Sequence, residues 1–384
     1  MAKIKNLKKA ALRIKKAVRE KENFILYSDS DLDGAVSLLI MEEIINTLGG
    51  KVSCRYFADR AQEGYGLNKK ALENIKNLKP AVLILTDCGI SNFEPIEKAE
   101  KMGFEVIIID HHDIMGKLPK ASIIIDPKQP GDKYPFKFMS ACGLCFKLAE
   151  EIFGKDISGS MRQNFLELVA LATISDMMPL KEDNKYFVEE GLNSLPFTFR
   201  PALLVLLGKF PPQDYSPREL AQKINSALMR TTMKDHLTYS YVFLTSPNIK
   251  IARGILKNIL EDKNRIDQLI FALTSEVMES QKNKKSPVVF EGGKDFLILT
   301  IGSIASRVCG KFKKPTFIYS TSKGLSRGSV RVPKGLNSLD ALRHCSSFLE
   351  VFGGHPPASG FSVKNKNLKE LKKCLEKYYS ANKK

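Results

Sequence analysis

Acidic and histidine residues gather at four places along the chain, and each place directly follows a run of apolar residues. The four places are 29–34, Asp87, 110–112 and Asp176. Carboxylate and imidazole groups that meet at one point form a site for hard or borderline divalent metal ions. If the fold brings these four places together, the sequence predicts a metal centre.

The spacing within this set suits two metal ions. Asp31 and Asp33 alternate along one segment, so their side chains can reach different ions, while Gly34 lets the chain turn tightly into a helix. Asp87 is the natural candidate to bridge the two ions. Two ions about 3.5–4 Å apart clamp the attacking and leaving oxygens of a phosphodiester and supply hydroxide near neutral pH. A metal-dependent phosphoesterase is therefore the simplest interpretation.

His111 and His112 bear on which metal ion such a site would bind. Imidazole shifts the preference from magnesium towards manganese, zinc or iron. The ordinary alternatives are a hydrogen-bonded buried histidine and an aspartate that only caps the next helix or forms a turn. However, the chain has five histidines, and two of them stand side by side after Asp110. One common site explains the four clusters better than four separate caps.

Three of the clusters follow short apolar runs whose composition is typical of strands. These runs span residues 24–27, 81–85 and 106–109, and helical patterns lie at 35–48, 69–77 and 95–102. Continuous β-branched runs indicate strands buried on both faces of a parallel sheet, and alternation with helices indicates right-handed βαβ units. Ligands of such folds bind outside the carboxyl ends of the strands. Asp176, after a helix at 165–174, could reach the same crevice.

The four clusters resemble, in this order, the motifs of the DHH phosphoesterase family. Among its branches, the chain most resembles the RecJ-type single-strand exonucleases. The further motifs that carry this resemblance are 63–67, 168–180, 223–227, 304–307, 328–331 and 353–360. The last three resemble the DHH-associated carboxyl-terminal domain, which in the family holds the substrate against the metal ions.

The resemblance implies a set of catalytic metal ligands and two divalent ions, manganese or alternatively magnesium. Carried over by position, the ligands are Asp31, Asp33, Asp87, His111, His112 and Asp176. Asp110 would be a ligand or would orient a histidine ring. Many relatives have a histidine ligand where this chain has Tyr27, so Asp29 or water would replace it.

The resemblance also implies residues that hold the substrate. In the first half these are Arg60, which could bind a terminal 5′-phosphate, together with Lys223 and Asn225; in the second half they are Ser306, Arg307, Ser329, Arg331, Gly353, Gly354 and His355. RecJ-type proteins usually have Pro-Arg where this chain has Gln222-Lys223, and lysine lacks the bidentate fork of arginine. We expect Ser306 and Arg307 to open or follow a helix. Ser329 and Arg331 alternate along a predicted strand and therefore face the same side.

A length of 384 residues predicts two domains, since single cores stop growing at about 250–300 residues. The sequence predicts an α/β parallel-sheet domain with a basic amino-terminal helix at 1–195, a helical connector at 196–285, and a smaller mixed α/β DHH-associated domain at 286–384. The connector includes a long amphipathic helix at 251–278. Strands are expected at 288–290, 296–299, 316–319 and 328–332.

The composition favours an anionic polymer as the substrate. The chain has 60 Lys and Arg against 42 Asp and Glu, a formal net charge of +18, and such a charge favours nucleic acid in a salt-sensitive way. A generally lysine-rich surface is the alternative. Seven cysteines and no amino-terminal apolar segment indicate a reducing cytoplasm, with Cys142 and Cys145 as structural or incidental thiols. No stretch is long and apolar enough for a membrane span.

These observations predict an exonuclease that hydrolyses single-stranded nucleic acid, with DNA favoured, RNA possible and 5′ to 3′ polarity suggested by the RecJ-like branch. The chain ends soon after His355 without the further OB domain of longer relatives, so the alternative is a phosphodiesterase of short oligoribonucleotides or cyclic dinucleotides. A non-catalytic replication scaffold is a third interpretation, which the retained carboxylates and histidines disfavour. Partners in replication or repair are expected from kinship.

Overall fold

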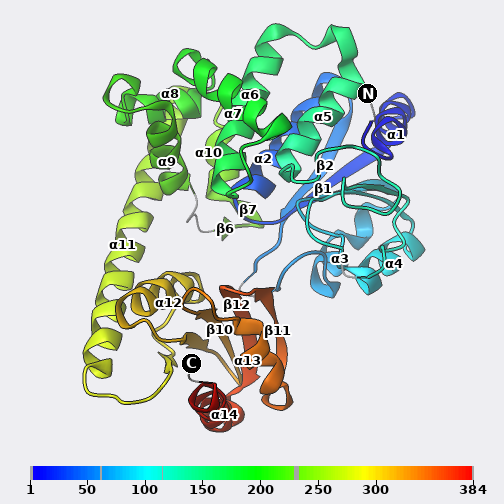
Figure 1. Ribbon diagram of the computed structural model, residues 1–384. Coiled ribbons are helices and arrows are strands. Elements are labelled where there is room, and N and C mark those ends of the chain that lie inside the picture. Colours follow the sequence, from blue (N-terminus) through cyan, green and yellow to red (C-terminus); the bar gives the residue numbers. More distant parts are fainter. Residues whose placement is uncertain (1–2, 61–62, 115, 229–232, 383–384) are drawn as a thin grey trace. The chain divides into compact units, whose positions relative to one another are not determined.

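The structure, a computed structural model, describes residues 3–60, 63–114, 116–228 and 233–382. The chain divides into two compact units, Met1–Asp262 and Lys263–Lys384. Each unit contains a five-stranded sheet of its own, and Figure 1 shows the course of the chain through both. Among the described residues, no helix is long and apolar enough to cross a membrane.

The sheet of the first unit is entirely parallel. Its strands are β1 (Asn23–Ser28), β2 (Lys51–Phe57), β3 (Ala81–Thr86), β4 (Phe104–Ile109) and β5 (Ile123–Ile125), in the order β2-β1-β3-β4-β5. The strands predicted at 24–27, 81–85 and 106–109 are therefore confirmed. The sequence does not reveal β2, because this edge strand is only partly buried and lacks a continuous apolar run.

Helices cover both faces of this sheet, which explains why the central strands are mostly apolar. The helices are α1 (Leu7–Arg19), α2 (Leu32–Thr47), α3 (Lys69–Ile75), α4 (Phe93–Lys101), α5 (Ala141–Phe153), α6 (Gly159–Ser175), α7 (Glu182–Ser194), α8 (Pro201–Lys209), α9 (Pro217–Leu228) and α10 (Tyr239–Leu244). Phe24 and Leu26 of β1 pack into the core with α1, α2, α5 and α6. Ile25 and Tyr27 pack on the opposite face, with residues of α3 and α4.

The helix α11 (Ile249–Gln281) has 33 residues and contains the predicted long helix at 251–278. It carries the chain from the first unit into the second. The sequence divides the chain after residues 195 and 285, whereas the structure divides it once, after Asp262. Helices α8, α9 and α10, which lie in the predicted connector, accordingly belong to the first unit.

The second unit has a mixed sheet. Its strands are β8 (Val289–Gly293), β9 (Thr316–Thr321), β10 (Leu325–Arg331), β11 (Leu349–His355) and β12 (Ala358–Lys364), in the order β11-β12-β10-β9-β8. Only β8 and β9 pair in parallel, and the other neighbours are antiparallel. The helices α12 (Ile298–Phe312), α13 (Ser338–His344) and α14 (Leu368–Ala381) complete this α/β unit. The expected mixed α/β class is confirmed.

Three local features of the structure differ from the sequence analysis. The predicted strand at 296–299 is wrong, because α12 begins at Ile298. A short run of apolar residues does not distinguish a strand from the first turn of a buried helix. The small hairpin of β6 (Met233–Lys234) and β7 (Leu237–Thr238) is not predicted. Cys345 and Cys374 form a disulfide, while the other five cysteines are free.

Candidate metal centre

The four clusters lie where the fold predicts that ligands collect, at the carboxyl ends of strands. Asp29 follows β1, Asp87 follows β3, and Asp110 follows β4. Asp31 is the N-cap of α2, and Asp176 is the C-cap of α6. One edge of a parallel sheet and the end of one helix therefore bring these residues together.

Within the first cluster, capping and metal-binding roles are compatible. The side chain of Asp31 accepts a hydrogen bond of 3.0 Å from the Gly34 amide, so Asp31 does cap α2. Position 34 requires glycine because the backbone of Asp29 lies very close to it, and an added Cβ would collide with the Asp29 carbonyl oxygen. The tight turn into the helix thereby fixes the carboxylates that precede it.

Asp33 is held by the amino-terminal end of another helix. Its carboxylate accepts hydrogen bonds from the amides of Ala141, at 2.8 Å, and Cys142, at 3.0 Å, at the start of α5. Free amides and the helix dipole at this end stabilise a negative charge. The Asp33 carboxylate is therefore fixed in position, with Oδ2 lying 3.8 Å from Nε2 of His111.

Asp87 combines an unusual backbone conformation with complete burial of its charge. Its φ is +57°, a left-handed value that a non-glycine residue rarely adopts and that often marks a functional position. The side chain is 3 % exposed. Burial, followed by the nearby carboxylates, raises the pKa of Asp87 well above its usual range. A cation beside this group would relieve the repulsion.

His111 lies at the centre of the carboxylates. Its Nε2 atom lies 3.2 Å from Asp87 Oδ1, 3.6 Å from Asp176 Oδ2 and 3.8 Å from Asp33 Oδ2. Burial lowers the pKa of His111, which favours the neutral imidazole that metal ions bind. Within the described part of the chain, neither His111 Nε2 nor Asp176 Oδ2 has a hydrogen-bond partner, although both atoms are buried. These donor atoms fit a divalent cation.

Asp110 orients the neighbouring histidine. It accepts hydrogen bonds from the amides of Ile90, His111 and His112 and lies 2.7 Å from Nδ1 of His112. Although burial alone would raise it, these hydrogen bonds, first among them that of the His112 ring, hold the pKa of Asp110 at about 2. Of the two roles open to Asp110, the geometry favours orientation of the ring over direct ligation.

Three groups of side chains could each hold a metal ion, with their ligand atoms within 4.8 Å of one another. They are Asp29, Asp31 and Asp87; Asp87, His111 and His112; and Asp33, His111 and Asp176. Asp87 belongs to two of these groups and His111 to two. The arrangement therefore fits adjacent cation sites that share ligands, and the bridging role of Asp87 stays a prediction.

Arg60 and Tyr27 differ in their relation to the cluster. Arg60 Nε donates to Asp29 Oδ1 at 2.6 Å and its Nη2 lies 3.0 Å from Asp31 Oδ2, while its expected role in phosphate binding stays a prediction. Tyr27 points to the opposite face of the sheet, where its hydroxyl donates to the carbonyl of Gly66. Asp29, rather than Tyr27, thus faces the cluster.

Tyr65 is a neighbour of the site that the sequence analysis did not single out. Its hydroxyl donates to the carbonyl oxygen of Asp87 at 3.1 Å and lies 3.2 Å from Nδ1 of His112. The signal for it was present in the motif at 63–67, whose glycines allow a close turn. The next residue, Gly66, has a φ of +73°. Tyr65 therefore holds the strand end that carries Asp87.

Lys223 and Asn225 lie on α9 and make internal contacts. Asn225 is buried and donates to the carbonyl of Leu171 on α6 at 2.9 Å. The ammonium of Lys223 lies 5.7 Å from the ring centre of Tyr215. The structure places neither residue in the three groups of candidate ligands, so their role in substrate binding stays a prediction.

In the second unit, Ser329 and Arg331 lie on one face of β10, as their alternation predicts. Arg331 Nη1 donates to Ser329 Oγ at 2.9 Å. Gly302 of α12 faces this pair, since a Cβ added there would lie 3.5 Å from both side chains. The sequence analysis did not single out Gly302, which lies beside this pair.

The other candidates of the second unit are more dispersed. Ser306 and Arg307 are exposed inside α12 and neither open nor follow it, so that expectation is wrong. Gly353 and Gly354 are exposed on β11, where they pair with Gly360 and Ser359, and His355 ends the strand opposite Ala358. The side chain of His355 lies outside what the structure describes.

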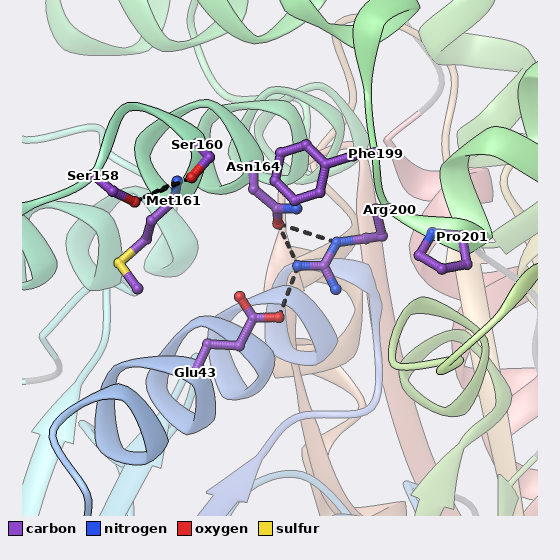
Figure 2. A pocket seen from close by; sticks show the side chains of 8 residues that line it. All are labelled: Glu43, Ser158, Ser160, Met161, Asn164, Phe199, Arg200 and Pro201. Atoms are coloured by element: carbon purple, nitrogen blue, oxygen red, sulfur yellow. Dashed lines mark hydrogen bonds and ion pairs between the residues drawn. The ribbon is translucent and has the colours of Figure 1, made fainter.

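A pocket elsewhere in the first unit does not share this chemistry. It has a volume of about 390 Å³ and is lined by Glu43, Ser158, Ser160, Met161, Asn164, Phe199, Arg200 and Pro201 (Figure 2). Arg200 is buried there, and its guanidinium binds Asn164, Glu43 and the carbonyl of Leu244. Because these internal partners engage the guanidinium, we interpret the network as a structural link between helices.

Comparison with known proteins agrees with this organisation. Residues 23–173 match the model of the DHH family, N-terminal domain, and residues 288–381 match that of the DHHA1 domain. The chain is 30 % identical to the single-stranded-DNA-specific exonuclease RecJ of Bacillus subtilis, over 97 % of this chain and 47 % of that protein. It is 27 % identical to the Escherichia coli RecJ, over 95 % of this chain and 68 % of that protein. The chain thus spans about half of the first relative.

Solved structures show the same fold. A crystal structure of exonuclease RecJ bound to manganese aligns with a TM-score of 0.84 at 22 % identity, covering 98 % of this chain and 95 % of the other. The RecJ structure from Thermus thermophilus in complex with Mn²⁺ aligns with a TM-score of 0.83 at 21 % identity, covering 99 % and 55 %. With its carboxylate and histidine motifs in one cluster and both domain models matched, this chain belongs to the DHH family.

Proposed function

We propose that this chain is a metal-dependent exonuclease that hydrolyses single-stranded DNA from the 5′ end. The observation that carries the proposal is the position of Asp87, which belongs to two adjacent groups of candidate metal ligands. Shared carboxylates of this kind are typical of sites that hold two divalent ions for phosphodiester hydrolysis. The names of the relatives from Bacillus subtilis and Escherichia coli specify single-stranded DNA as the substrate.

Bound divalent ions would supply Lewis acidity and a hydroxide nucleophile near neutral pH, and manganese suits the mixed carboxylate and imidazole donors. Asp29, Asp31, Asp33, Asp87, His111, His112 and Asp176 would hold them. The protein's own part is to fix these donors. Asp110 holds the His112 ring, the start of α5 holds Asp33, and Tyr65 holds the backbone of Asp87.

A pair of polar side chains in the second unit supports the proposal. Arg331 and Ser329 form a half-buried donor pair on β10, and an arginine of this kind suits a phosphate group. The net charge of +18 favours a polyanion in general. We propose that Ser329, Arg331, Arg307 and the glycine-rich end of β11 hold the strand.

Polarity and the choice between DNA and RNA are the finer parts of the proposal. Short oligoribonucleotides and cyclic dinucleotides are the alternative substrates, and the expected cytoplasmic location and repair partners also stay predictions. A scaffold without activity is disfavoured because the candidate ligands are present and their atoms converge.

The test is a hydrolysis assay with manganese and a single-stranded DNA oligonucleotide labelled at the 5′ end or the 3′ end in parallel. We expect immediate release of labelled mononucleotide from the 5′ label only, and none with a chelator. The variant Asp176→Asn should be inactive. Its matched control is Asp113→Asn, because Asp113 follows the histidine pair in sequence, is 72 % exposed and pairs with Lys128.

Each outcome of this assay has a distinct meaning. Release from the 3′ label would reverse the proposed polarity, and cleavage of short RNA in preference to DNA would favour the alternative substrate. Absence of cleavage of DNA, short RNA and cyclic dinucleotides would overturn the enzyme assignment and favour the scaffold. Full activity of Asp176→Asn would contradict the assignment of the metal centre.

A further inference from the structure

A positively charged side chain already lies on one of the three groups of candidate metal ligands. The guanidinium of Arg60 donates from Nε to Asp29 Oδ1 at 2.6 Å, and its Nη2 lies 3.0 Å from Asp31 Oδ2 and also contacts Asp29 Oδ2. Asp29 and Asp31 are the same carboxylates that, with Asp87, could hold a cation. The arginine and a metal ion would therefore share ligands.

We propose that Arg60 is a resident counter-ion of Asp29 and Asp31, which a metal ion displaces when it binds there. Arg60 would then lower the affinity of this group for metal ions, and metal binding would free the guanidinium. The inference deepens the proposed function, since it rests on the proposed metal centre, but it does not depend on which nucleic acid is cleaved.

The burial of Asp29 explains why a counter-ion is needed. The side chain of Asp29 is 0 % exposed. A buried carboxylate without a partner is strongly unfavourable. Arg60 supplies the opposite charge and hydrogen bonds to Asp29 and Asp31 while no metal ion is bound, and it thereby holds the Asp29 carboxylate in place. An empty site of four or more carboxylates would otherwise repel itself.

The structure also allows Arg60 to leave without unfolding the site. Its side chain is 49 % exposed, and its guanidinium lies 5.6 Å from the ring centre of Tyr65. The following part of its segment is anchored independently, because the buried Glu63 accepts a hydrogen bond from Tyr56 and pairs with Lys70. A rotation of the long Arg60 side chain is therefore sufficient to expose Asp29 and Asp31.

Electrostatics determine the direction of the exchange. A divalent ion among Asp29, Asp31 and Asp87 brings two positive charges next to the guanidinium, so the two cations repel each other. The metal ion bonds directly to carboxylate oxygens and carries the higher charge, and it therefore wins at sufficient concentration. The released guanidinium then faces solvent beside the metal centre, where an anionic ligand can bind it.

The first experiment is a titration of the full chain with Mn²⁺ by isothermal calorimetry after removal of metal ions with a chelator. We expect Arg60→Gln to bind Mn²⁺ about tenfold more tightly than the unchanged protein at one site, because a competing cation has been removed. Arg60→Lys, which keeps the charge but loses the fork, should lie between them. Arg162→Gln is the matched control, since Arg162 pairs with Glu150 on the same unit.

A second measurement uses the unchanged protein and so does not depend on the folding of a variant. In the metal-free protein the Nε–H of Arg60 is hydrogen-bonded to Asp29, so NMR should show it protected from exchange with solvent. Addition of the diamagnetic ion Mg²⁺ should remove this protection. The Nε–H of Arg13, which binds Glu105, should stay protected.

The outcomes separate this inference from the proposed function. Mn²⁺ affinity that is unchanged or weaker in Arg60→Gln, or Nε–H protection that persists with saturating Mg²⁺, would overturn the counter-ion role alone. No binding of Mn²⁺ by the unchanged protein would overturn both the metal centre and the inference. Tighter binding by Arg60→Gln in a protein that fails to cleave DNA would support the inference and reject only the proposed substrate.

Discussion

The two units place their polar residues by different physical means. In the first unit, most of the candidate ligands follow buried parallel strands. Hydrogen bonds from backbone amides hold their carboxylates in place independently of a metal ion. Asp33 accepts two amides of α5, and Asp110 accepts three amides around the end of β4. In the second unit, Ser306, Arg307, Gly353 and Gly354 are exposed.

The difference indicates a division of roles. A metal centre requires donor atoms within a few tenths of an ångström of fixed positions, and buried strand ends provide that precision. A surface that holds a flexible polyanion requires charge and reach more than rigidity. We therefore expect changes in the first unit to abolish chemistry and changes in the second unit to weaken binding.

The largest expected effect comes from Asp87→Asn, which keeps the shape of the side chain and removes its charge. We expect the rate of hydrolysis to fall by at least about a thousandfold, because metal ions supply several kcal/mol of charge stabilisation. The metal-free variant should remain folded, since burial and neighbouring carboxylates already raise the pKa of Asp87. Rates and calorimetric Mn²⁺ binding, measured on the same preparation, check both parts.

The control for this change is Asp113→Asn, which should keep both the rate and the Mn²⁺ affinity. Unchanged Mn²⁺ binding in Asp87→Asn would show that Asp87 is not shared between two sites. A lost rate that is accompanied by unfolding of the metal-free variant would instead make Asp87 a structural residue and would weaken the contrast between the units.

The second prediction concerns the disulfide, which lies in the second unit only. Cys345 and Cys374 are 29 residues apart in sequence and join the end of α13 to α14. Closing a loop of this length stabilises a fold by about 3–4 kcal/mol. We expect a reductant to lower the melting temperature of the second unit while Mn²⁺ binding by the first unit stays unchanged.

Differential scanning calorimetry with and without reductant, combined with Mn²⁺ titration, separates the two units. The variant Cys54→Ser serves as the control, because Cys54 is a free thiol of the first unit and its replacement should leave the reductant effect intact. Loss of Mn²⁺ affinity on reduction would show that the units depend on each other for stability.

The same comparison explains what the sequence could predict. The ends of β1, β3 and β4 could be predicted because continuous apolar runs mark buried parallel strands, and parallel strands end at a common edge. The orientation of Tyr27 is also encoded, since alternation along β1 places it with Ile25 and away from Leu26. The topology thus determines which side chains of this unit meet.

The remaining features depend on contacts that have no local sequence signal. The ion pair of Arg60 with Asp29 is set by a side-chain conformation, and the disulfide is set by the distance between two helices of the second unit. The strands β11 and β12 contain glycines and polar residues, so their pattern is weak. The start of α12 was misassigned because four apolar residues fit either type of element.

The third prediction concerns Asp126, a buried carboxyl group of the first unit, and the pH dependence of stability that it causes. Burial, which dominates, raises the pKa of Asp126 to about 7, and one of its oxygens is buried without a hydrogen-bond partner among the described residues. A carboxyl group whose pKa is raised by folding destabilises the fold as pH rises from about 4 through 7. Asp126→Asn removes this penalty, so the variant should be the more stable protein at pH 8.

We expect Asp126→Asn to raise the free energy of unfolding by about 2 kcal/mol at pH 8. The full pKa shift of Asp126 corresponds to about 4 kcal/mol, of which the substitution recovers a part. The gain should shrink towards pH 4, where Asp126 is protonated in both states. Thermal melts of chelator-treated protein across this pH range measure the difference. A constant difference at every pH would show that the carboxyl group is not the cause.

The smallest expected effect belongs to Arg331→Ala in the second unit. Arg331 is half-buried, and its guanidinium is oriented by Ser329 Oγ and the carbonyl of Val330. Loss of one oriented phosphate contact should weaken binding of a single-stranded oligonucleotide by about tenfold. It should also reduce, by about one, the slope of the logarithm of the binding constant against the logarithm of the salt concentration. Arg331→Lys should recover only part of the affinity, since lysine lacks the fork.

Binding is best measured with the hydrolysis-deficient Asp87→Asn protein as the background, so that the oligonucleotide stays intact. Arg343→Ala is the matched control, because Arg343 is 69 % exposed on the same unit and pairs with Asp340. An Arg331→Ala protein with unchanged affinity and salt dependence would remove β10 from the substrate site. Mn²⁺ binding is measured separately, on Arg331→Ala in the otherwise unchanged protein. If that variant lost Mn²⁺ binding, the division of roles between a rigid metal centre and a separate binding surface would be wrong, because a residue of one unit would then determine the chemistry of the other.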